Sequence, residues 1–426
     1  METLKLGILG MGTVASGLIN IIEMNNTKIT GKVGKEIKVE KVLVKNIEKK
    51  RNINLPQEVY TSDPYEVINN KEIQILVELI GGINPAYEYI KAALNNKKHV
   101  VTANKALIST HGEELEEVAQ KNGVRLMYEA SVGGGIPIIN TITENLAANE
   151  FDEIIGIING TTNYILTQMT DRGLEFDQAV KEAQDLGFAE ADPSSDVDGD
   201  DAAYKLSILS YVAFGQRVNM KDISKEGITK ISKEDINYAK ELGYNIKLLA
   251  SACKIGDELE LRVHPALIHA GHPLSTVKNE FNAVLLKGNA VGDIMLYGRG
   301  AGSLPTGSAV LGDVITIAKN IDDKVKVSEY NNQGKYKIVN KALKKYYIRF
   351  EVIDEPGVLG NIANIFGNNN ISLASVVQRQ KNGDATAPLV FITHDVERKN
   401  IDAALKEIEK YNNVTNISSI IMVENL

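Results

Sequence analysis

Short apolar runs and longer amphipathic segments alternate through residues 1–130. The runs are rich in Val, Ile and Leu, as is typical of strands buried on both faces, and the segments between them place apolar residues at helical spacing. The expected strands are Leu4–Leu9, Ile37–Val44, Ile75–Leu79, His99–Thr102 and Val124–Tyr128, and the expected helices are Thr13–Glu23, Pro85–Asn95 and Glu113–Asn122. This order predicts a doubly wound parallel sheet covered by helices on both faces.

A different texture, with glycine-rich strands and longer helices, runs from residue 131 to 306 and predicts an α+β domain. The expected strands there are Ile154–Asn159 and Ala283–Asn289, and the expected helices are Thr162–Asp171, Phe176–Leu186, Asp200–Phe214 and a segment capped by Ser232 that ends at Leu242. Residues 307–320 are apolar at helical spacing, so we expect a helix that packs back on the first domain.

Residues 321–345 are polar and predict a linker, and a small unit follows at residues 346–426. Its expected strands are Tyr346–Ile353, Ile371–Arg379, Ala387–His394 and Val414–Val423, and its expected helices are Gly357–Asn368 and Asn400–Tyr411. This βαββαβ order predicts a ferredoxin-like fold. The whole chain is therefore expected to be an α/β protein with domains at residues 1–130, 131–306 and 346–426.

The chain carries 47 Lys and Arg against 55 Asp and Glu, which gives a formal net charge of −8. This acidic balance argues against nucleic acid as a main partner, since phosphate binding needs a dense basic face. The apolar runs are far shorter than the roughly 20 residues that a membrane span needs. No signal-peptide pattern precedes the first strand, and Cys253 is the single cysteine. We therefore expect a cytoplasmic protein with no membrane partner.

A glycine-rich loop, Gly10-Met11-Gly12-Thr13-Val14-Ala15, joins the first strand to the first helix. This is the G-x-G-x-x-A pattern in the context that dinucleotide binding requires in a Rossmann-type domain. Gly10 would allow the tight turn, Gly12 would let the backbone approach a pyrophosphate, and the helix that begins at Thr13 and Val14 would point free N–H groups at it. The alternative is an ordinary strand-to-helix turn without a ligand.

The second strand ends near Lys45 instead of near the carboxylate that usually bonds the ribose of NAD. A carboxylate there would repel a 2′-phosphate, whereas Lys45 would attract it, so the sequence favours NADP and leaves NAD possible. An exposed lysine with no ligand is the alternative.

Polar residues also stand where the third and fourth strands end, at the edge of a parallel sheet that binds ligands. Gly81 leaves room there for a nicotinamide ring, and Thr102 and Lys105 follow the fourth strand. Reduction of a carbonyl needs a cation or acid beside the oxygen, so Lys105 is a candidate for that role.

An acidic segment supplies the second candidate cation. Asp201 and Lys205 are four positions apart and share one face of a predicted helix. Lys205 is a candidate proton donor, and Glu190, Asp196 and Asp201 are candidates for binding a substrate ammonium group. The alternative for Asp201 and Lys205 is an ordinary ion pair on the protein surface.

These segments together resemble one family, the monofunctional homoserine dehydrogenases with a C-terminal ACT domain. The resemblance covers residues 6 to about 310, and a further one to ACT domains begins at Tyr346. The matching motifs stand in the expected order and are Gly10–Val14, Thr102–Lys105, Glu129–Pro137, Asn159–Tyr164, Gly187–Lys205 and Gly298–Gly302. Two positions depart from the family's usual residues, Ala15 in place of Gly and Lys45 in place of Arg.

The resemblance implies reversible NAD(P)-dependent interconversion of L-aspartate 4-semialdehyde and L-homoserine, a step toward threonine, methionine and isoleucine. It implies that Lys205 is the proton donor and that Lys105 lies beside nicotinamide and substrate. The residues implied to bind substrate are Glu190, Asp201, Asp196, Thr161 and Tyr164, and those implied to contact cofactor include Gly187 and Gly302.

The resemblance also implies a monovalent cation, commonly sodium, at Glu129, Val132, Gly134 and Ile136. From the residues alone, Gly133-Gly134-Gly135 would be a flexible turn. An ACT domain implies an amino-acid effector, here most plausibly L-threonine, near the turn at Asp354–Gly357, or a dimerisation module without a ligand. The family implies a homodimer or homotetramer.

Two rival functions remain open from the sequence. One is another amino-acid-pathway dehydrogenase with an ACT tail, such as one acting on prephenate, but a dicarboxylate substrate would call for arginines in place of the acidic segment at 190–205. The other is a non-catalytic amino-acid sensor that keeps the cofactor fold, and intact Lys105 and Lys205 argue against it.

Overall fold

The computed structural model describes residues 2–51, 53, 55–323, 336–341, 343–378 and 386–425. It separates into two compact units, each assembled from three stretches of chain. The first unit holds residues 1–154, 204–222 and 281–336, and the second holds residues 155–203, 223–280 and 337–426. The domain boundaries expected from the sequence stay predictions, and the expected linker at 321–345 lies partly outside the described residues.

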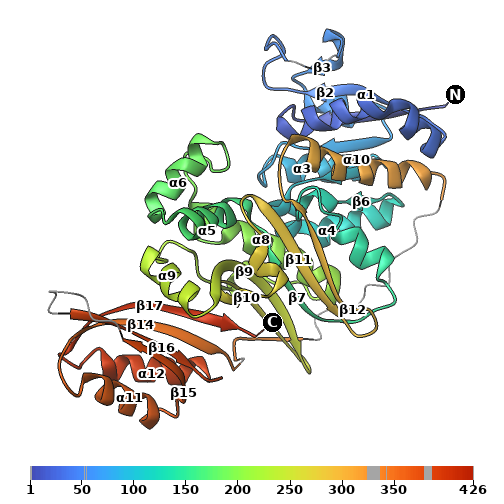
Figure 1. The fold of residues 1–426 in the computed structure, drawn as a ribbon. Helices are drawn as coiled ribbons and strands as arrows, with labels where there is room; N and C mark the ends of the chain where they lie inside the picture. Colours follow the sequence, from blue (N-terminus) through green and yellow to red (C-terminus); the bar gives the residue numbers. More distant parts are fainter. Residues whose placement is uncertain are drawn as a thin grey trace. The chain divides into compact units, whose positions relative to one another are not determined.

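The first unit is built on a six-stranded parallel sheet with the strand order β3-β2-β1-β4-β5-β6 (Figure 1). Its strands are β1 (Thr3–Leu9), β2 (Glu36–Leu43), β3 (Tyr60–Thr61), β4 (Ile75–Glu78), β5 (His99–Thr102) and β6 (Leu126–Met127). Its helices include α1 (Thr13–Val33), α2 (Pro64–Ile68), α3 (Ala86–Asn95), α4 (Lys105–Asn122) and α10 (Ser303–Lys319). The expected parallel α/β architecture is confirmed, and the short strand β3 and helix α2 are additions to it.

Alternate residues of the strands enter two separate hydrophobic cores. Val77 and Val101 pack in one core with residues of α1 and α10. Their neighbours Leu76 and Val100 point the other way and pack with residues of α2, α3 and α4. Because successive side chains of a strand face opposite sides, this division shows that helices cover both faces of the sheet.

Helix α10 lies against α1, as Figure 1 shows, and glycines make the approach possible. A Cβ atom on Gly17 would lie 2.0 Å from the Ser303 carbonyl oxygen, and one on Gly307 would lie 2.6 Å from the Leu18 nitrogen. The Ser303 hydroxyl donates to the Thr13 carbonyl oxygen at 2.8 Å. The start of α10 is therefore fixed beside the first turn of α1.

Helices α1 and α4 are longer than the sequence predicts. Helix α4 begins at Lys105, eight residues before the expected start, because Asn104 caps it by accepting from the Leu107 amide at 3.2 Å. The polar residues Ser109, Thr110 and His111 interrupt the apolar spacing and hide this first part of the helix in the sequence. Helix α1 continues to Val33 across a non-helical residue, Asn25.

The second unit contains a long antiparallel hairpin that the sequence analysis did not identify. Its strands β9 (Tyr244–Ile255) and β10 (Glu258–His269) pair along their whole lengths. The helices of this unit include α5 (Gly160–Arg172), α6 (Phe176–Asp185), α7 (Ser194–Val197) and α9 (Lys233–Glu241). The short strands β8 (Ser224–Lys225) and β13 (Lys337–Val339) add to β10.

The C-terminal part of this unit has the expected βαββαβ order, with both helices on one face of its sheet (Figure 1). Its elements are β14 (Lys345–Ile353), α11 (Val358–Asn368), β15 (Leu373–Gln378), β16 (Thr386–Thr393), α12 (Arg398–Ile408) and β17 (Val414–Glu424). The expected strand at 371–379 ends outside the described residues. Strand β17 pairs in parallel with β10, so the sheet continues into the hairpin.

Four elements lie at the boundaries of the units or outside the parallel sheet. Strand β7 (Phe151–Ile157) and helix α8 (Asp200–Phe214) each run across a unit boundary. Strands β11 (Phe281–Gly288) and β12 (Gly292–Arg299) form an antiparallel hairpin in the first unit. Within the described residues, no helix is long and apolar enough to cross a membrane.

Two buried charge clusters attach the βαββαβ part to the rest of the second unit. The Glu424 carboxylate contacts His264 Nε2 at 3.1 Å and accepts from Lys344 Nζ at 2.7 Å. Asp235, in the first turn of α9, accepts from Arg349 Nε at 2.7 Å and is completely buried. Breaking one partner of such a buried pair leaves an uncompensated charge, so both contacts favour one fixed docking of the two parts.

We predict that Glu424→Gln destabilises the chain at neutral pH by about 3–5 kcal/mol. Burial raises the pKa of Glu424, but the hydrogen bonds and charges of His264 and Lys344 outweigh it and hold the pKa at about 2 instead of 4.5. Because the folded-state pKa is lowered, the stabilisation is complete above about pH 4.5 and is lost as the pH falls toward 2.

Thermal unfolding of both proteins between pH 3 and 7 measures this difference. The gap in Tm between the wild type and Glu424→Gln should be widest near pH 7 and should narrow below about pH 4.5. The exposed Glu409→Gln is the control and should leave Tm unchanged at every pH. A Tm difference between the wild type and Glu424→Gln that does not vary with pH would contradict the claim that ionised Glu424 stabilises the fold.

Candidate active site

The glycine-rich loop between β1 and α1 uses its two glycines in different ways. Gly10 has φ +100°, and a Cβ there would lie 2.8 Å from the Leu79 carbonyl oxygen, so the turn itself requires glycine. A Cβ on Gly12 would meet no atom within 4 Å. The chain therefore leaves open space at Gly12, directly before Thr13 and Val14, whose N–H groups belong to the first turn of α1.

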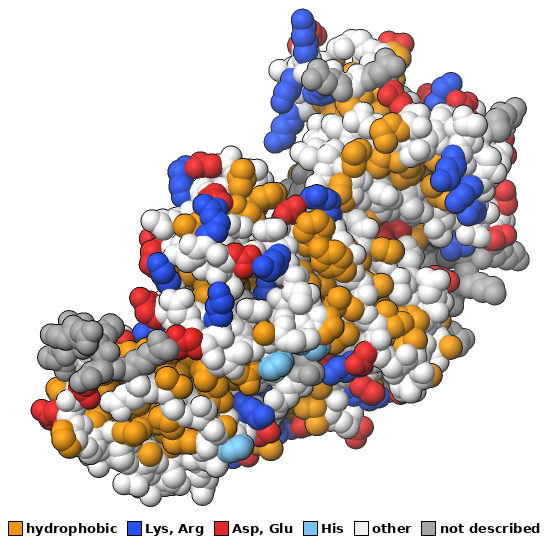
Figure 2. All heavy atoms as spheres, in the orientation of Figure 1, with side chains coloured by type: hydrophobic (Ala, Val, Ile, Leu, Met, Phe, Trp, Pro, Cys, Tyr) orange, Lys and Arg blue, Asp and Glu red, His pale blue; other side chains and the backbone are white. Residues whose placement is uncertain are grey.

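A pocket of about 320 Å³ lies beside this loop and carries three basic side chains. It is lined by Met11, Ser16, Asn20, Lys49, Lys50, Arg51 and Ile53. Lys45, the expected 2′-phosphate partner, is exposed and is absent from this lining. Figure 2 shows Lys and Arg side chains gathered over the part of the first unit that carries β2 and β3.

Arg51 is the most firmly held of these cations. Its guanidinium donates to the carbonyl oxygens of Lys49 and Asn46, both at 2.7 Å, and lies 5.0 Å from the centre of the Tyr60 ring. These contacts fix a planar donor group at the pocket in a geometry suited to a phosphate.

A buried carboxylate organises the edge of the sheet where β4 and β5 end. Glu78 accepts from the Ile80 amide at 2.7 Å, from the Gly81 amide at 3.0 Å and from the Thr102 hydroxyl at 2.6 Å. The Thr102 side chain is thus engaged with Glu78, which leaves its backbone as the part that can face a ligand. Gly81 has φ +79° and open space where a Cβ would be.

The two candidate lysines lie on helices that contact each other. Lys105 is the first residue of α4, one turn before Ser109, and Lys205 lies in α8, two residues before Ser207. The hydroxyls of Ser109 and Ser207 are hydrogen-bonded at 2.8 Å. Lys205 is 9% exposed. Both lysines therefore lie in the first unit, on helices that this hydrogen bond joins, and the convergence of their amines on a substrate stays a prediction.

The acidic segment is organised by an asparagine that the sequence analysis did not single out as a site residue. The Asn159 amide nitrogen donates to Asp201 at 2.8 Å and to Asp196 at 2.6 Å. Its amide oxygen accepts from the Thr162 amide at 2.8 Å and so caps α5. An Asn directly before a helical segment is the signal that could have identified it.

Asp201 and Lys205 are both buried, so the alternative of a surface ion pair is wrong. Asp201 is 4% exposed and lies in the first turn of α8, one turn before Lys205. Moving two ionisable side chains out of water is costly, and a chain gains nothing in stability from doing so at an isolated pair. Buried ionisable side chains of this kind are candidates for a functional site.

Thr161 and Tyr164 shape the segment that carries Glu190. The Thr161 hydroxyl donates to the Phe188 carbonyl oxygen at 2.7 Å, and the Tyr164 ring lies 4.9 Å from the Phe188 ring. Burial and the neighbouring Glu182 carboxylate raise the pKa of Tyr164 to about 12, and its hydroxyl donates to that carboxylate. Glu190 is exposed. Thr161 and Tyr164 thus contact the segment that carries Glu190, and their binding of substrate stays a prediction.

Gly187 begins this segment with φ +76° and has open space where a Cβ would lie. Gly302 has φ +116° and directly precedes α10, whose Ser303 is bonded to Thr13. The structure therefore brings Gly302 close to the glycine-rich loop of the first unit. Gly187 belongs to the second unit.

The loop at Glu129–Ile136 is closely packed, so the flexible turn indicated by the residues alone is wrong. A Cβ on Gly134 would lie 2.4 Å from the Gly300 carbonyl oxygen, and Val132 and Ile136 are buried. The Glu129 carboxylate accepts from the Ile139 and Asn140 amides at 2.8 and 2.7 Å. Of the described residues, no three His, Cys, Asp or Glu gather as a metal cluster. Backbone carbonyl oxygens are the ligands that this loop offers a cation.

Comparisons with known proteins agree with this arrangement. Three family models match the chain: "Homoserine dehydrogenase, NAD binding domain" at residues 10–129, "Homoserine dehydrogenase" at residues 137–315 and "ACT domain" at residues 346–413. The homoserine dehydrogenase of Synechocystis sp. is 44% identical over 433 residues, which cover 99% of each chain.

Solved structures give the same result. A homoserine dehydrogenase from Thiobacillus denitrificans superposes with a TM-score of 0.93 at 40% identity, over 100% of this chain and 99% of the other. A hyperthermophilic archaeal homoserine dehydrogenase in complex with NADPH superposes with a TM-score of 0.64 at 28% identity. The match covers 76% of this chain and 100% of the other. The chain therefore belongs to the homoserine dehydrogenase family of NAD(P)-dependent oxidoreductases that act on a CH–OH group, in the form that ends in an ACT domain.

Proposed function

We propose that the chain interconverts L-aspartate 4-semialdehyde and L-homoserine, with Lys205 as the proton donor to the carbonyl oxygen. The burial of Asp201 and Lys205 one turn apart on α8 carries this proposal. An amino-acid aldehyde bears an ammonium group that needs carboxylates and a carbonyl that needs a cation, and this helix offers both. The step serves the synthesis of threonine, methionine and isoleucine.

The nicotinamide cofactor supplies the hydride, and the chain supplies orientation and charge. Asp201 is held by Asn159 and, with Asp196 and Glu190, binds the substrate ammonium. Lys105 polarises the carbonyl from the start of α4, and Lys205 gives a proton to the oxygen as negative charge develops on it. Because both lysines are shielded from water to some extent, their charges act more strongly than they would in solvent.

We predict that Lys205→Ala lowers kcat at least about a hundredfold, since one positioned acid contributes 10²–10⁴ to a rate. Steady-state kinetics with NADPH and aspartate semialdehyde measures the loss, and NADPH fluorescence titration shows whether cofactor binding is kept. Lys240→Ala, a change at an exposed lysine of α9, is the matched control. A Lys205→Ala enzyme that folds, binds NADPH and keeps more than a tenth of kcat contradicts the role.

We also propose that the chain prefers NADP. The support is the pocket beside Gly12, where Lys49, Lys50 and Arg51 stand and none of the described lining residues is a carboxylate. The archaeal relative with NADPH bound points the same way. A ribose 2′-phosphate there would accept from the fixed Arg51 guanidinium, whereas the 2′-hydroxyl of NAD would gain little from these charges.

Arg51→Ala should therefore raise the KM for NADPH about tenfold or more and leave the KM for NADH nearly unchanged. Initial rates with each coenzyme measure the two values. Lys45→Ala, which removes an exposed lysine outside the pocket lining, should change neither value more than about twofold. Equal effects of Arg51→Ala on both coenzymes would place the 2′-phosphate elsewhere.

A sodium ion fits the buried loop at Glu129, Val132, Gly134 and Ile136, because hard cations prefer oxygen ligands and the loop presents backbone carbonyls. It would fix that loop against Gly300.

We further propose a homodimer or homotetramer. Apolar side chains on β12, with Tyr297 54% exposed, support an interface on that hairpin.

The ACT domain is proposed to bind L-threonine as an end-product inhibitor near the turn at Asp354–Gly357. We propose that threonine binding is coupled to the active site through β14, the strand that leads into this turn. Strand β14 holds Arg349, which is paired with Asp235 of α9. Helix α9 in turn contacts α5, the helix capped by Asn159.

Threonine at millimolar concentration should lower the initial rate of the wild type at least about twofold. Arg349→Met should weaken this inhibition while the uninhibited kcat stays within about threefold, because the coupling contact is lost and the active site is not touched. Serine is the control ligand. Equal inhibition of the wild type and a folded Arg349→Met enzyme would exclude this route.

A further inference from the structure

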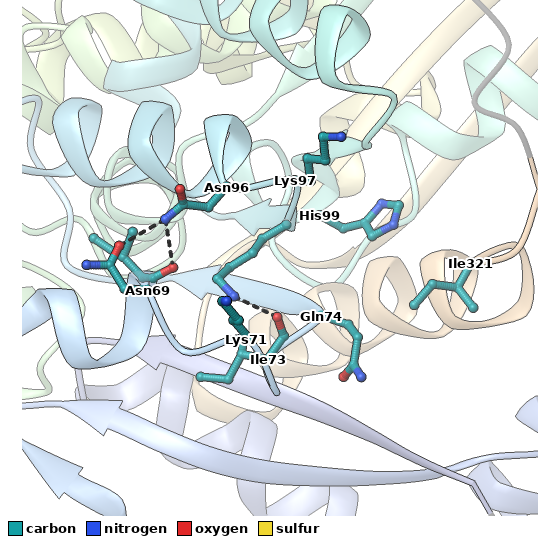
Figure 3. A pocket seen from close by; sticks show the side chains of 10 residues that line it. Asn69, Lys71, Ile73, Gln74, Asn96, Lys97, His99 and Ile321 are labelled. Carbon is teal, nitrogen blue, oxygen red and sulfur yellow. Dashed lines mark hydrogen bonds between the residues drawn. The ribbon is translucent and has the colours of Figure 1, made fainter.

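A second basic pocket lies in the first unit, at the amino ends of β4 and β5. We call it the amino-edge pocket; it has a volume of about 460 Å³. Its lining consists of Ile68, Asn69, Lys71, Ile73, Gln74, Asn96, Lys97, Lys98, His99 and Ile321 (Figure 3). The proposed cofactor and substrate groups, Gly81 and Lys105 among them, follow the opposite, carboxyl ends of the same strands. A ligand of this pocket is therefore neither the substrate nor the cofactor.

Lys98 brings a buried ammonium group to this pocket. It is 4% exposed, and its Nζ donates to the carbonyl oxygens of Ile73 at 2.8 Å and Asn70 at 2.5 Å. An ammonium group has three N–H donors, so one remains beyond these two bonds. Within the described part of the chain, no ion pair joins Lys98 to a carboxylate, and burial lowers its pKa. A buried cation of this kind gains stability from an anion beside it.

His99 adds a second buried donor. It is 8% exposed, and its Nδ1 accepts from the Arg125 amide at 3.1 Å, so the proton of the neutral ring is on Nε2. Burial and the charge of Arg125 lower the pKa of His99 to about 4, which keeps the ring neutral at pH 7. Figure 3 shows this ring extending toward Ile321. Over the residues that the structure describes, no acceptor is hydrogen-bonded to Nε2–H.

Further basic and amide side chains line the amino-edge pocket and stand at its rim. Lys71 is exposed at the rim, and the amides of Asn69, Asn96 and Gln74 also line the pocket, whereas Lys97 points away in Figure 3. None of the described lining residues is acidic. We propose that the amino-edge pocket binds a small oxyanion, a carboxylate or phosphate group of a metabolite, through Lys98, His99 and Lys71.

The test uses the full chain saturated with NADP⁺ and labelled with ¹⁵N-histidine, so that anion binding at the cofactor site is already blocked. Orthophosphate and citrate are titrated separately at constant ionic strength set with NaCl. We expect a saturable shift of the His99 resonances with at least one of them. A response to phosphate alone indicates a phosphate ester, and a response to citrate alone indicates a carboxylate.

Two variants test the residues. Lys71→Ala should weaken binding of the anion about three- to tenfold. Lys121→Ala removes an exposed lysine at the end of α4 and should leave the affinity unchanged. His99→Asn keeps an acceptor near the Arg125 amide but removes Nε2–H; it assigns the resonance and should weaken binding, measured by calorimetry, about tenfold.

Lys71→Ala and His99→Asn should both keep the dehydrogenase kcat. A failure of the anion-binding proposal can therefore be told apart from a failure of the proposed dehydrogenase function. The proposal is overturned by His99 resonances that do not move with either anion up to about 50 mM, the range of weak metabolite binding. It is equally overturned when Lys71→Ala and Lys121→Ala bind the anion as tightly as the wild type does.

Discussion

One asparagine side chain holds together the acidic half of the site. The Asn159 amide donates to both Asp196 and Asp201 and at the same time caps α5, so the helix start and the two carboxylates are fixed as a single group. Two carboxylates that share one donor repel each other unless a cation is near. We propose that these carboxylates bind the ammonium group of an amino-acid substrate, and α8 carries Lys205 one turn beyond Asp201.

Close backbone contacts fix the elements around the glycine-rich loop, where we propose that the cofactor binds. Gly17 and Gly307 let α10 approach α1, and the Ser303–Thr13 hydrogen bond then places Gly302 beside the glycine-rich loop. The first helix of the dinucleotide-binding fold is therefore positioned by a segment nearly 300 residues away in sequence. The Glu78 carboxylate fixes the neighbouring edge through Gly81 and Thr102. Together these contacts hold the loop without filling the space at Gly12.

The sequence predicted those features whose signal is local. The glycine-rich loop and the βαββαβ order follow from spacing and turn residues, and the structure has both. The start of α4 is not identified from the sequence, because polar residues and a glycine interrupt the helical spacing after Ile108. The hairpin β9–β10 is not identified either, although Gly256-Asp257, the two residues between the strands, is a typical hairpin turn. Burial is a tertiary property, so the sequence could not tell that Asp201 and Lys205 are enclosed or that Lys49, Lys50 and Arg51, instead of Lys45, line the pocket beside the loop.

The central claim is that Lys205 protonates the carbonyl oxygen of the substrate when the neighbouring carbon receives the hydride. A crystal structure of the chain with NADP⁺ and L-homoserine tests it most directly. We predict that Lys205 Nζ lies within about 2.6–3.2 Å of the substrate hydroxyl, or reaches it through one water molecule. An ammonium group more than about 6 Å from that oxygen, with another side chain in hydrogen-bond contact with it, would contradict the account.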